Sequence, residues 1–270
     1  MFIDTFTYFN ERELLELRVR ALQDYVDGFI VSEGNRTHRG ESKPYTCLET
    51  IRELGLPEEM IWVVHAELPT IEEASDPWVR ERGQRDALAP ALTRLPGETI
   101  FLCSDVDELV KPSVIDELKE MLGEDPSKII GLSMSMHYGR ADRQLCSPTG
   151  ELFEWRCATV CTVSTLETHG NITEVRAQAN REFLGNRDAG WHFSWMGDAD
   201  TRRTKLRSIA EYYLWDTESV RERCSRFTPT VGSTDMLGRE DHLLTGYKIE
   251  DLPEEAVKVE RVRKYLLPDG

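Results

Sequence analysis

The stretch Thr99-Ile-Phe-Leu-Cys-Ser-Asp-Val-Asp-Glu-Leu-Val110 decides the fold, because an apolar run of strand length stops at two aspartates one residue apart. Thr99 to Cys103 predicts a short strand that is buried on both faces, as the strands of parallel sheets are. Asp105 and Asp107 then follow its carboxyl end, which is where ligands bind in open α/β sheets. Carboxylate oxygens at that position suit Mg²⁺ or Mn²⁺. The alternative is local, with Asp105 beginning a turn and Asp107 capping the next segment.

The composition is that of a soluble globular protein. The chain has 270 residues, of which 40% are hydrophobic and 30% charged. No apolar run approaches the roughly 20 residues that span a bilayer, and the N-terminus lacks the basic start of a secretory signal. A net charge of −16 argues against general binding to nucleic acid, which depends on clustered Lys and Arg. These features predict a cytoplasmic protein without a transmembrane segment.

The six cysteines are scattered along the chain and form no CxxC pair. This spacing predicts reduced thiols and no disulfide framework. Cys157 and Cys161, with His169 nearby, raise the alternative of a zinc site. Their apolar setting, Cys-Ala-Thr-Val-Cys, favours buried and inert thiols instead.

The N-terminal segment predicts a β-α-β unit. Phe2 to Phe6 reads as a strand, and Asn10-Glu-Arg-Glu13 has the spacing of a capping box with Asn10 as the cap. The helix that follows ends near Tyr25, and Phe29 to Val31 reads as a second strand. A right-handed crossover between parallel strands is the default for this arrangement.

The next segments place cations at the same edge of the sheet as Asp105. A polar loop over residues 35–44 follows the second strand, and a helix over 45–54 leads to a strand over 61–64. A helix over 78–95, kinked at Pro90, turns Arg85 toward the core. A buried cation needs a partner, which is either a carboxylate in a salt bridge or a bound phosphate.

After the acidic pair, a helix over 111–122 and a strand over 129–136 are predicted, and the regular β-α alternation then stops. Gly190-Trp-His-Phe-Ser-Trp-Met-Gly197 surrounds His192 with aromatic residues, which suits either a core histidine or a further metal ligand. A helix over 200–215 carries Arg202 and Lys205, whose register directs them toward a crevice. Its inner face is predicted to hold Leu206, Ile209, Ala210, Tyr213 and Leu214.

Several motifs, in this order, resemble glycosyltransferase family seventeen, the group of the β-1,4-mannosyl-glycoprotein β-1,4-N-acetylglucosaminyltransferases and their bacterial and viral relatives. The resemblance covers most of the chain. It rests on Ile3-Asp-Thr-Phe6, Phe9-Asn-Glu11, Leu14 to Arg18, Val26 to Thr37, Gly40, Lys43-Pro44, Arg80-Glu81, Gln84-Arg-Asp86, Asp105-Val-Asp-Glu-Leu109, Gly190 to Trp195 and Lys205.

The resemblance implies an α/β fold of GT-A type, with a Rossmann-like, mostly parallel sheet flanked by helices. Residues 1–270 would form one domain, in which 1–136 bind the nucleotide sugar and the less regular 137–270 face the acceptor. It also implies Mn²⁺ or Mg²⁺, a UDP-sugar donor and an inverting transfer of N-acetylglucosamine or another hexose. The implied metal ligands are Asp105, Asp107 and His192. The implied donor-binding residues are Asp4, Phe6, Glu33, Lys43, Arg85, Asp105 and Lys205.

The sequence leaves the catalytic base and the acceptor open. Asp188, Glu240 and Asp241 are the candidate bases, because an inverting transfer needs a carboxylate to deprotonate the acceptor hydroxyl. The chain lacks the membrane anchor of the secreted family members, which favours a glycan or another acceptor in a bacterial or viral setting. Two other functions remain: a phosphohydrolase of the haloacid dehalogenase type, with Asp105 as nucleophile, and a module that binds a nucleotide sugar or glycan without turnover.

Overall fold

The computed structural model describes residues 1–179 and 183–268 of the chain. The strands are β1 (Phe2–Tyr8), β2 (Gly28–Gly34), β3 (Ile61–Ala66), β4 (Ile100–Asp105), β5 (Glu108–Val110), β6 (Ile130–Tyr138), β7 (Arg140–Cys146), β8 (Glu154–Trp155), β9 (Thr159–Thr162), β10 (Phe183–Ser194) and β11 (Leu243–Gly246). The helices are α1 (Arg12–Leu22), α2 (Cys47–Glu53), α3 (Pro77–Asp86), α4 (Ala89–Leu92), α5 (Ile115–Glu124), α6 (Val163–His169), α7 (Ile172–Ala179), α8 (Ala199–Ser208), α9 (Tyr212–Trp215), α10 (Glu218–Arg226), α11 (Glu254–Lys258) and α12 (Glu260–Leu266). Short 3₁₀ turns cover Glu58–Met60, Pro112–Val114 and Ile249–Asp251. Over the described part of the chain, no helix combines the length and apolar character that a membrane span requires.

One sheet joins the two halves of the chain in the order β11-β7-β6-β9-β4-β1-β2-β3. The strands β3, β2, β1 and β4 are parallel, whereas β9 is antiparallel to both β4 and β6. Thr7 pairs with Asp105, and Tyr8 pairs with Glu33, so these carboxyl ends meet at one edge. The predicted α/β class with a Rossmann-like parallel portion is confirmed, and the sheet as a whole is mixed.

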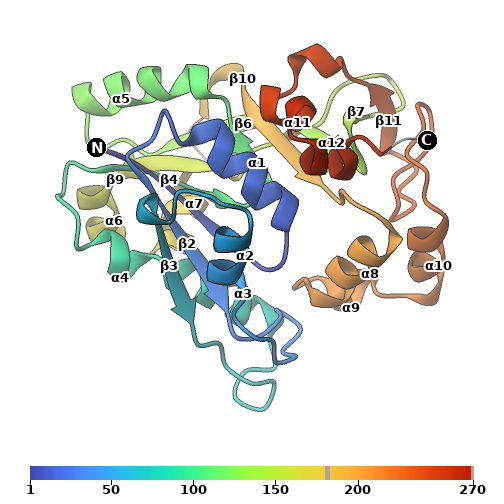
Figure 1. Cartoon of the computed structure of the whole chain (residues 1–270), viewed down its shortest axis with the longest axis horizontal. Helices are drawn as coiled ribbons and strands as arrows, with labels where there is room; N and C mark the ends of the chain where they lie inside the picture. The colour runs from blue at the N-terminus through green and yellow to red at the C-terminus, as the bar shows by residue number, and fades with distance from the viewer. Residues whose placement is uncertain (180–182, 269–270) are drawn as a thin grey trace.

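The parallel strands are apolar on both faces because helices cover both faces. Phe2 and Phe6 pack in one core with residues of α1, α5 and α12, whereas Ile3 of the same strand packs in a second core with α4, α6 and α7. Successive side chains of a strand point to opposite faces, so this alternation places β1 between two helical layers. Figure 1 shows α5 and α1 along one side of the sheet, with α11 and α12 close to α1.

The helices α8 to α10 form a separate group beside the end of β10. In Figure 1, α8, α9 and α10 lie together, away from the parallel strands. Their apolar residues, including Leu206, Val220 and Cys224, pack in a third core that also contains Trp195 and Leu244. This group therefore forms a wall at the edge of the sheet where β4 ends.

Two expected helices are each divided in the structure. The predicted helix over 78–95 is α3 and α4, and Pro90 is at the second position of α4. Pro90 has no N–H to give to the carbonyl four residues earlier, so the expected kink is a break. The predicted helix over 200–215 ends at Ser208 because Ile209 is extended, and its expected inner residues Tyr213 and Leu214 are exposed.

The prediction of a capping box over Asn10 to Glu13, at the start of α1, is wrong. The helix begins at Arg12, and Asn10 makes no side-chain cap. The Glu11 carboxylate instead accepts hydrogen bonds from the backbone N–H groups of Phe9 and Asn10, at 3.0 and 3.1 Å. Glu11 is thereby fixed beside the carboxyl end of β1.

Gly190 permits the close approach of β10 to β5. A Cβ atom at this position would lie 2.2 Å from the carbonyl oxygen of Leu109, a distance that no side chain tolerates. The two strands pair so that His192 lies opposite Glu108, and Phe193 donates its N–H to the Asp107 carbonyl at 2.8 Å. The glycine thus brings His192 of β10 next to the turn between β4 and β5, which carries Asp105 and Asp107. We call residues 105–108 the acidic turn.

All six cysteines are free thiols, as the sequence predicts. Burial raises the pKa of Cys103 and of Cys157 to about 11 in each case. Thiols with such pKa values stay protonated at neutral pH and are poor nucleophiles and poor metal ligands. These values agree with the expectation of buried, inert thiols.

Candidate functional site

Asp107 is the carboxylate on which two basic side chains converge. Lys205 of α8 donates to Asp107 Oδ2 at 2.8 Å, and His192 Nε2 lies 3.6 Å from the same oxygen. Burial raises the pKa of Asp107, but Lys205 and His192 together lower it by more than burial raises it. The net pKa of Asp107 therefore lies well below the usual range. The carboxylate is therefore charged at any physiological pH. The structure brings together three residues that lie far apart in the sequence.

Asp105 is held by two arginines. Its Oδ1 accepts from Arg85 at 3.2 Å and from Thr7 at 3.0 Å, and Arg176 of α7 lies 3.6 Å from Oδ2. Burial raises the pKa of Asp105, yet Arg176 and Arg85 outweigh burial and keep its pKa low. Arg85 also bonds Glu81, so both of its partners in the structure are carboxylates. Arg85 therefore forms salt bridges in the structure, and its role in donor binding stays a prediction.

Arg18 binds the backbone of the acidic turn through hydrogen bonds to its carbonyl groups. Its guanidinium binds both oxygens of Asp4, at 2.6 and 2.7 Å, and donates to the carbonyls of Asp105 and Glu108 at 2.9 and 2.7 Å. It also stacks over the Phe6 ring, 4.5 Å from the centroid. Asp4 and Phe6 are fully buried by these contacts, so the structure does not place them in a pocket as the resemblance implied.

We expect Arg18→Leu to lower the free energy of unfolding by about 3 to 5 kcal/mol, because it leaves the buried Asp4 carboxylate without a partner. Chemical denaturation of the purified variant measures this change. Arg12→Leu is a matched control on the same helix: its exposed ion pair with Glu53 is worth about 1 kcal/mol or less. Equal losses in the two variants would contradict the supporting role of Arg18.

Glu33 and Lys43 organise the loop after β2. The Glu33 carboxylate is buried and accepts from Lys43 Nζ at 2.8 Å and from the backbone N–H groups of Thr46 and Cys47. Lys43 Nζ also lies 5.6 Å from the centre of the Phe9 ring. Glu33 is thereby bound to the start of α2 and is shielded from solvent. Lys43 lies near Phe9, which lines the inner cavity described next.

A small inner cavity of about 70 Å³ adjoins the acidic turn. Its lining residues are Phe9, Glu11, Arg36, Thr37, His38, Gln84, Lys205, Ser208 and Ile209. The loop after β2 closes over it, because His38 N donates to Ser208 O at 3.0 Å and Arg39 pairs with Asp216 at 3.0 Å. Arg39 also lies 4.9 Å from the Tyr212 ring centre. The loop and the α8–α9 segment thus form one bridge over the cavity.

Glu11 and Glu211 are two acidic residues near the site to which the sequence gave no catalytic or binding role. Burial raises the pKa of Glu11, Lys205 lowers it and Asp107 raises it, and the net pKa is above the usual value. Glu211 also has a raised pKa, through burial and the nearby Glu81 and Asp105 charges. Glu11 lies in the short loop after β1, at the edge of the sheet where β4 ends. This position could have indicated a site residue, but the stretch was interpreted as a helix cap.

The structure does not bring the three candidate bases to the acidic turn. Asp188 is exposed and pairs with Lys111 at 2.7 Å. It precedes His192 by four residues of β10, which is about 13 Å along a strand. Glu240 and Asp241 are exposed in the loop before β11, where Asp241 bonds His242. None of the three carboxylates contacts Asp107 or Lys205 within the described structure.

The donor set fits a divalent cation held by few protein atoms. Among the described residues, no three His, Cys, Asp or Glu side chains gather into a cluster that would enclose a metal. Asp107 and His192 offer one carboxylate and one imidazole nitrogen, and Mg²⁺ is commonly bound by one or two carboxylates with water and substrate phosphate. Asp105, engaged by two arginines, is less available than the resemblance implied.

Comparisons with known proteins agree with the motifs. Residues 1–199 match the family described as glycosyltransferase family 17. No curated protein sequence matches the chain.

Several solved structures show a weak likeness. They include a 4-diphosphocytidyl-2C-methyl-D-erythritol synthase (12% identity, TM-score 0.42, 70% of this chain and 90% of that chain). Others are the mannose-6-phosphate isomerase from Helicobacter pylori (11%, 0.38, 72% and 90%) and residues 1–349 of TarS from S. aureus (11%, 0.42, 83% and 68%). TM-scores this low do not by themselves establish a shared fold.

Proposed function

The chain belongs to glycosyltransferase family 17, and from this premise we propose a metal-dependent, inverting transfer of a hexose from a UDP-sugar to a hydroxyl group, on a fold of GT-A type. The observation that carries the proposal is the convergence of Lys205 and His192 on Asp107, beside the inner cavity. A charged carboxylate with cations around it, at the carboxyl ends of parallel strands, suits a metal and a diphosphate. Membership of this family leaves the phosphohydrolase alternative without support.

The cations at the site match the charge of a departing diphosphate. Lys205, Arg85 and Arg176 all lie within 4 Å of Asp105 or Asp107 oxygens. Preorganised positive groups stabilise the charge that develops on a leaving group more than they stabilise the ground state. We assign to Lys205 the direct contact with the diphosphate, because its side chain also lines the inner cavity.

A Mn²⁺ or Mg²⁺ ion would be held by Asp107 and His192. When bound, the ion supplies Lewis-acid stabilisation of the diphosphate oxygens. Asp107 contributes a fixed negative charge because its pKa stays low, and His192 contributes a neutral nitrogen ligand. Phe193 and Gly190 position the imidazole through the pairing of β10 with the acidic turn.

Glu11 is the base that the geometry favours. It lines the inner cavity with Lys205, and its raised pKa gives it a higher affinity for a proton than an ordinary glutamate has. In the transfer, the acceptor O–H gives its proton to Glu11 and its oxygen forms the new bond to the anomeric carbon. The bond from that carbon to the diphosphate breaks, and its electron pair leaves with the nucleoside diphosphate.

A panel of nucleotide sugars, with and without Mn²⁺, tests the proposal. At a ligand concentration of about 100 times Kd, the true donor should raise the melting temperature by about 5 to 10 °C, and this shift should need Mn²⁺. Release of the nucleoside diphosphate over time should accompany binding once a hydroxyl acceptor is added. Saturable binding without any release would identify a binding module, and release of phosphate from simple phosphomonoesters would identify a phosphohydrolase.

A further inference from the structure

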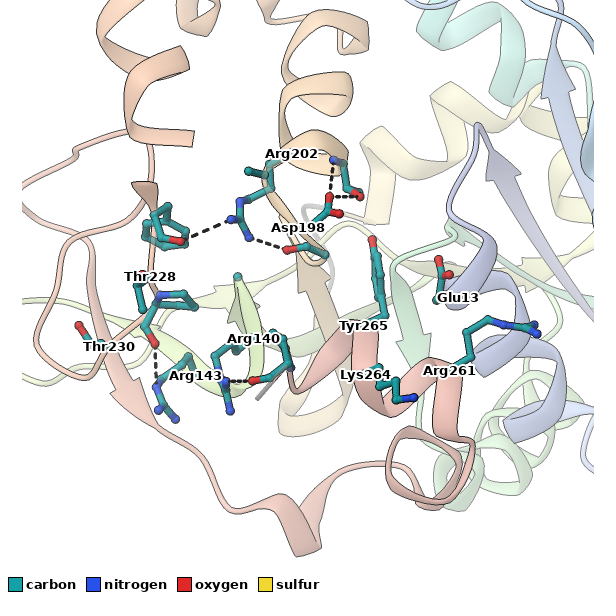
Figure 2. Close-up of a pocket in the computed structure, with 17 residues that line it drawn as sticks. Glu13, Arg140, Arg143, Asp198, Arg202, Thr228, Thr230, Arg261, Lys264 and Tyr265 are labelled. Carbon is teal, nitrogen blue, oxygen red and sulfur yellow. Dashed lines mark hydrogen bonds between the residues drawn. The ribbon is translucent and has the colours of Figure 1, made fainter. Parts of the chain in front are cut away.

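A second and larger cavity lies at the N-terminal end of α8, where Asp198, Thr201 and Arg202 line it. Its volume is about 860 Å³, which is in the range of ligand pockets. Figure 2 shows side chains from β7, α8, α12, α1 and the loop after α10 around it. We call it the basic cavity, and its lining residues are Glu13, Gly139, Arg140, Arg143, Gly197, Asp198, Ala199, Thr201, Arg202, Phe227, Thr228, Pro229, Thr230, Arg261, Lys264, Tyr265 and Pro268.

The lining of the basic cavity is positive although the chain is strongly negative. Five of the lining side chains are Arg or Lys and two are Asp or Glu, in a chain with a net charge of −16. Arg140 and Arg143 share one carboxylate, that of Asp142. An acidic protein that gathers cations at one place creates a local site for an anion.

Arg202 is the one of these cations that lacks a carboxylate partner in the described structure. It is 7% exposed, and its guanidinium donates only to two backbone carbonyls, those of Gly197 at 2.5 Å and Phe227 at 3.4 Å. Its Nε is buried without a hydrogen-bond partner. A buried charge without a counter-ion is unfavourable, and burial accordingly lowers the pKa of Arg202. An anionic group in the cavity would remove this penalty.

The other walls of the cavity suit a sugar. The rings of Phe227 and Tyr265 supply apolar faces, and Thr228 and Thr230 add hydroxyl groups to the lining. A few polar groups on a largely apolar lining are typical of small-molecule sites. Guanidinium groups match both the phosphate and the carboxylate geometry.

Tyr265 lines the basic cavity and lies near acidic residues of the site. Burial raises the pKa of its hydroxyl, and the charges of Glu11, Glu13 and Asp107 raise it further, so Tyr265 lies within the electrostatic reach of both places. The helix α8 connects them as well, because Lys205 reaches Asp107 and Arg202 reaches the basic cavity. Arg202 and Lys205 are one turn apart on α8, so the two cavities adjoin the same helix.

We propose that the basic cavity binds an anionic saccharide, through a phosphate or carboxylate group on Arg202, and that this saccharide is the acceptor. The acceptor role rests on the proposed function, whereas the binding of the anion does not. Arg140, Arg143 and Lys264 complete the positive wall around that group.

Isothermal titration in the presence of saturating UDP tests the binding with glucose 6-phosphate, glucuronate and glucose. At least one of the two anionic sugars should bind about tenfold or more tightly than glucose, and Arg202→Gln should weaken it by about tenfold or more, since a charge-assisted hydrogen bond is lost. The two anionic probes show whether the site prefers phosphate or carboxylate. Equal affinities for all three sugars would overturn the proposal.

Because Arg202→Gln alters a buried position, the double variant Arg143→Gln and Lys264→Gln provides a second route. Its two side chains are more exposed, and it should weaken the anionic sugar while leaving glucose unchanged. Arg52→Gln, on α2, removes an exposed arginine elsewhere and should change nothing. An anionic sugar whose affinity is the same in the wild type and both cavity variants would overturn the proposal.

The acceptor role is tested separately from the binding of the anionic sugar. Asp107→Ala should retain binding of the anionic sugar, because Asp107 does not line the basic cavity. Anionic saccharides that bind in an Arg202-dependent way should also receive the sugar in a transfer assay. Binding without transfer to any of them would keep the anion site and overturn the acceptor role, whereas failure of donor turnover altogether would count against the proposed function.

Discussion

Glu11→Gln is expected to reduce turnover by about 10² to 10⁴, the usual contribution of a general base. The amide keeps the size of the side chain and its acceptor oxygen, so the backbone N–H groups of Phe9 and Asn10 still have a partner. It cannot take a proton from the acceptor hydroxyl. The Kd of the donor should stay within a few-fold of the wild type, which separates a catalytic role from a folding defect. Single-turnover kinetics with saturating donor measures the loss.

The pH profile gives an independent test of Glu11. A base works in its deprotonated form, so activity should fall as the pH drops through the pKa of Glu11. Because burial raises this pKa, the fall should begin at a higher pH than for an ordinary glutamate. Glu11→Gln should lose this acidic limb, and Glu49→Gln, an exposed glutamate on α2, should keep it. Normal turnover and an unchanged profile in Glu11→Gln would exclude Glu11 as the base.

Asp107→Ala should abolish the effect of Mn²⁺ on donor binding and reduce transfer by about a hundredfold or more, since a metal ion contributes several kcal/mol to such reactions. Lys205 then loses its carboxylate partner but remains in the inner cavity. Some donor binding should therefore persist, with the same Kd in Mn²⁺ and in EDTA. Titration of the donor under both conditions measures the change.

Asp116→Ala, at an almost fully exposed position of α5, is the matched control and should bind and transfer like the wild type. A donor affinity in Asp107→Ala that still rises with Mn²⁺ would show that the metal is held elsewhere. If the wild type itself gave equal affinities in Mn²⁺ and EDTA, Lys205 and the arginines would be the only cations that stabilise the diphosphate.

The parallel half of the fold was predictable because its signals are local. Short apolar runs ending at turns gave β1, β2, β3 and β4, and the rule that parallel strands end at one edge placed Asp105 at the same edge of the sheet as Glu33. The resemblance implied that Asp107 and His192 hold a metal ion and that Lys205 binds the donor. The structure brings these three side chains together, with Lys205 at 2.8 Å and His192 at 3.6 Å from the same Asp107 oxygen.

The supporting contacts were not predictable, because they join residues distant in the sequence. Nothing near Asp4 indicates that Arg18 neutralises it and holds the carbonyls of Asp105 and Glu108. The capping interpretation of residues 10–13 assumed that Glu11 interacts only with its neighbours in the sequence. In the structure its surroundings include Lys205 of α8. At the break after Ser208, the Ser208 carbonyl accepts a hydrogen bond from the backbone N–H of His38, which is likewise distant in the sequence.

The bridge over the inner cavity links the two binding events thermodynamically. The cavity holds about 70 Å³, and ligands of the size of a nucleotide sugar occupy roughly 300 Å³ or more, so the bridge has to part before a donor is seated. The bridge includes the C-terminal end of α8, and this helix carries Arg202 and Lys205 one turn apart on the same face, with Arg202 lining the basic cavity and Lys205 the inner cavity. Occupancy of either cavity then changes the affinity of the other by the same factor, as linkage requires. Donor and acceptor would cooperate through a single helix.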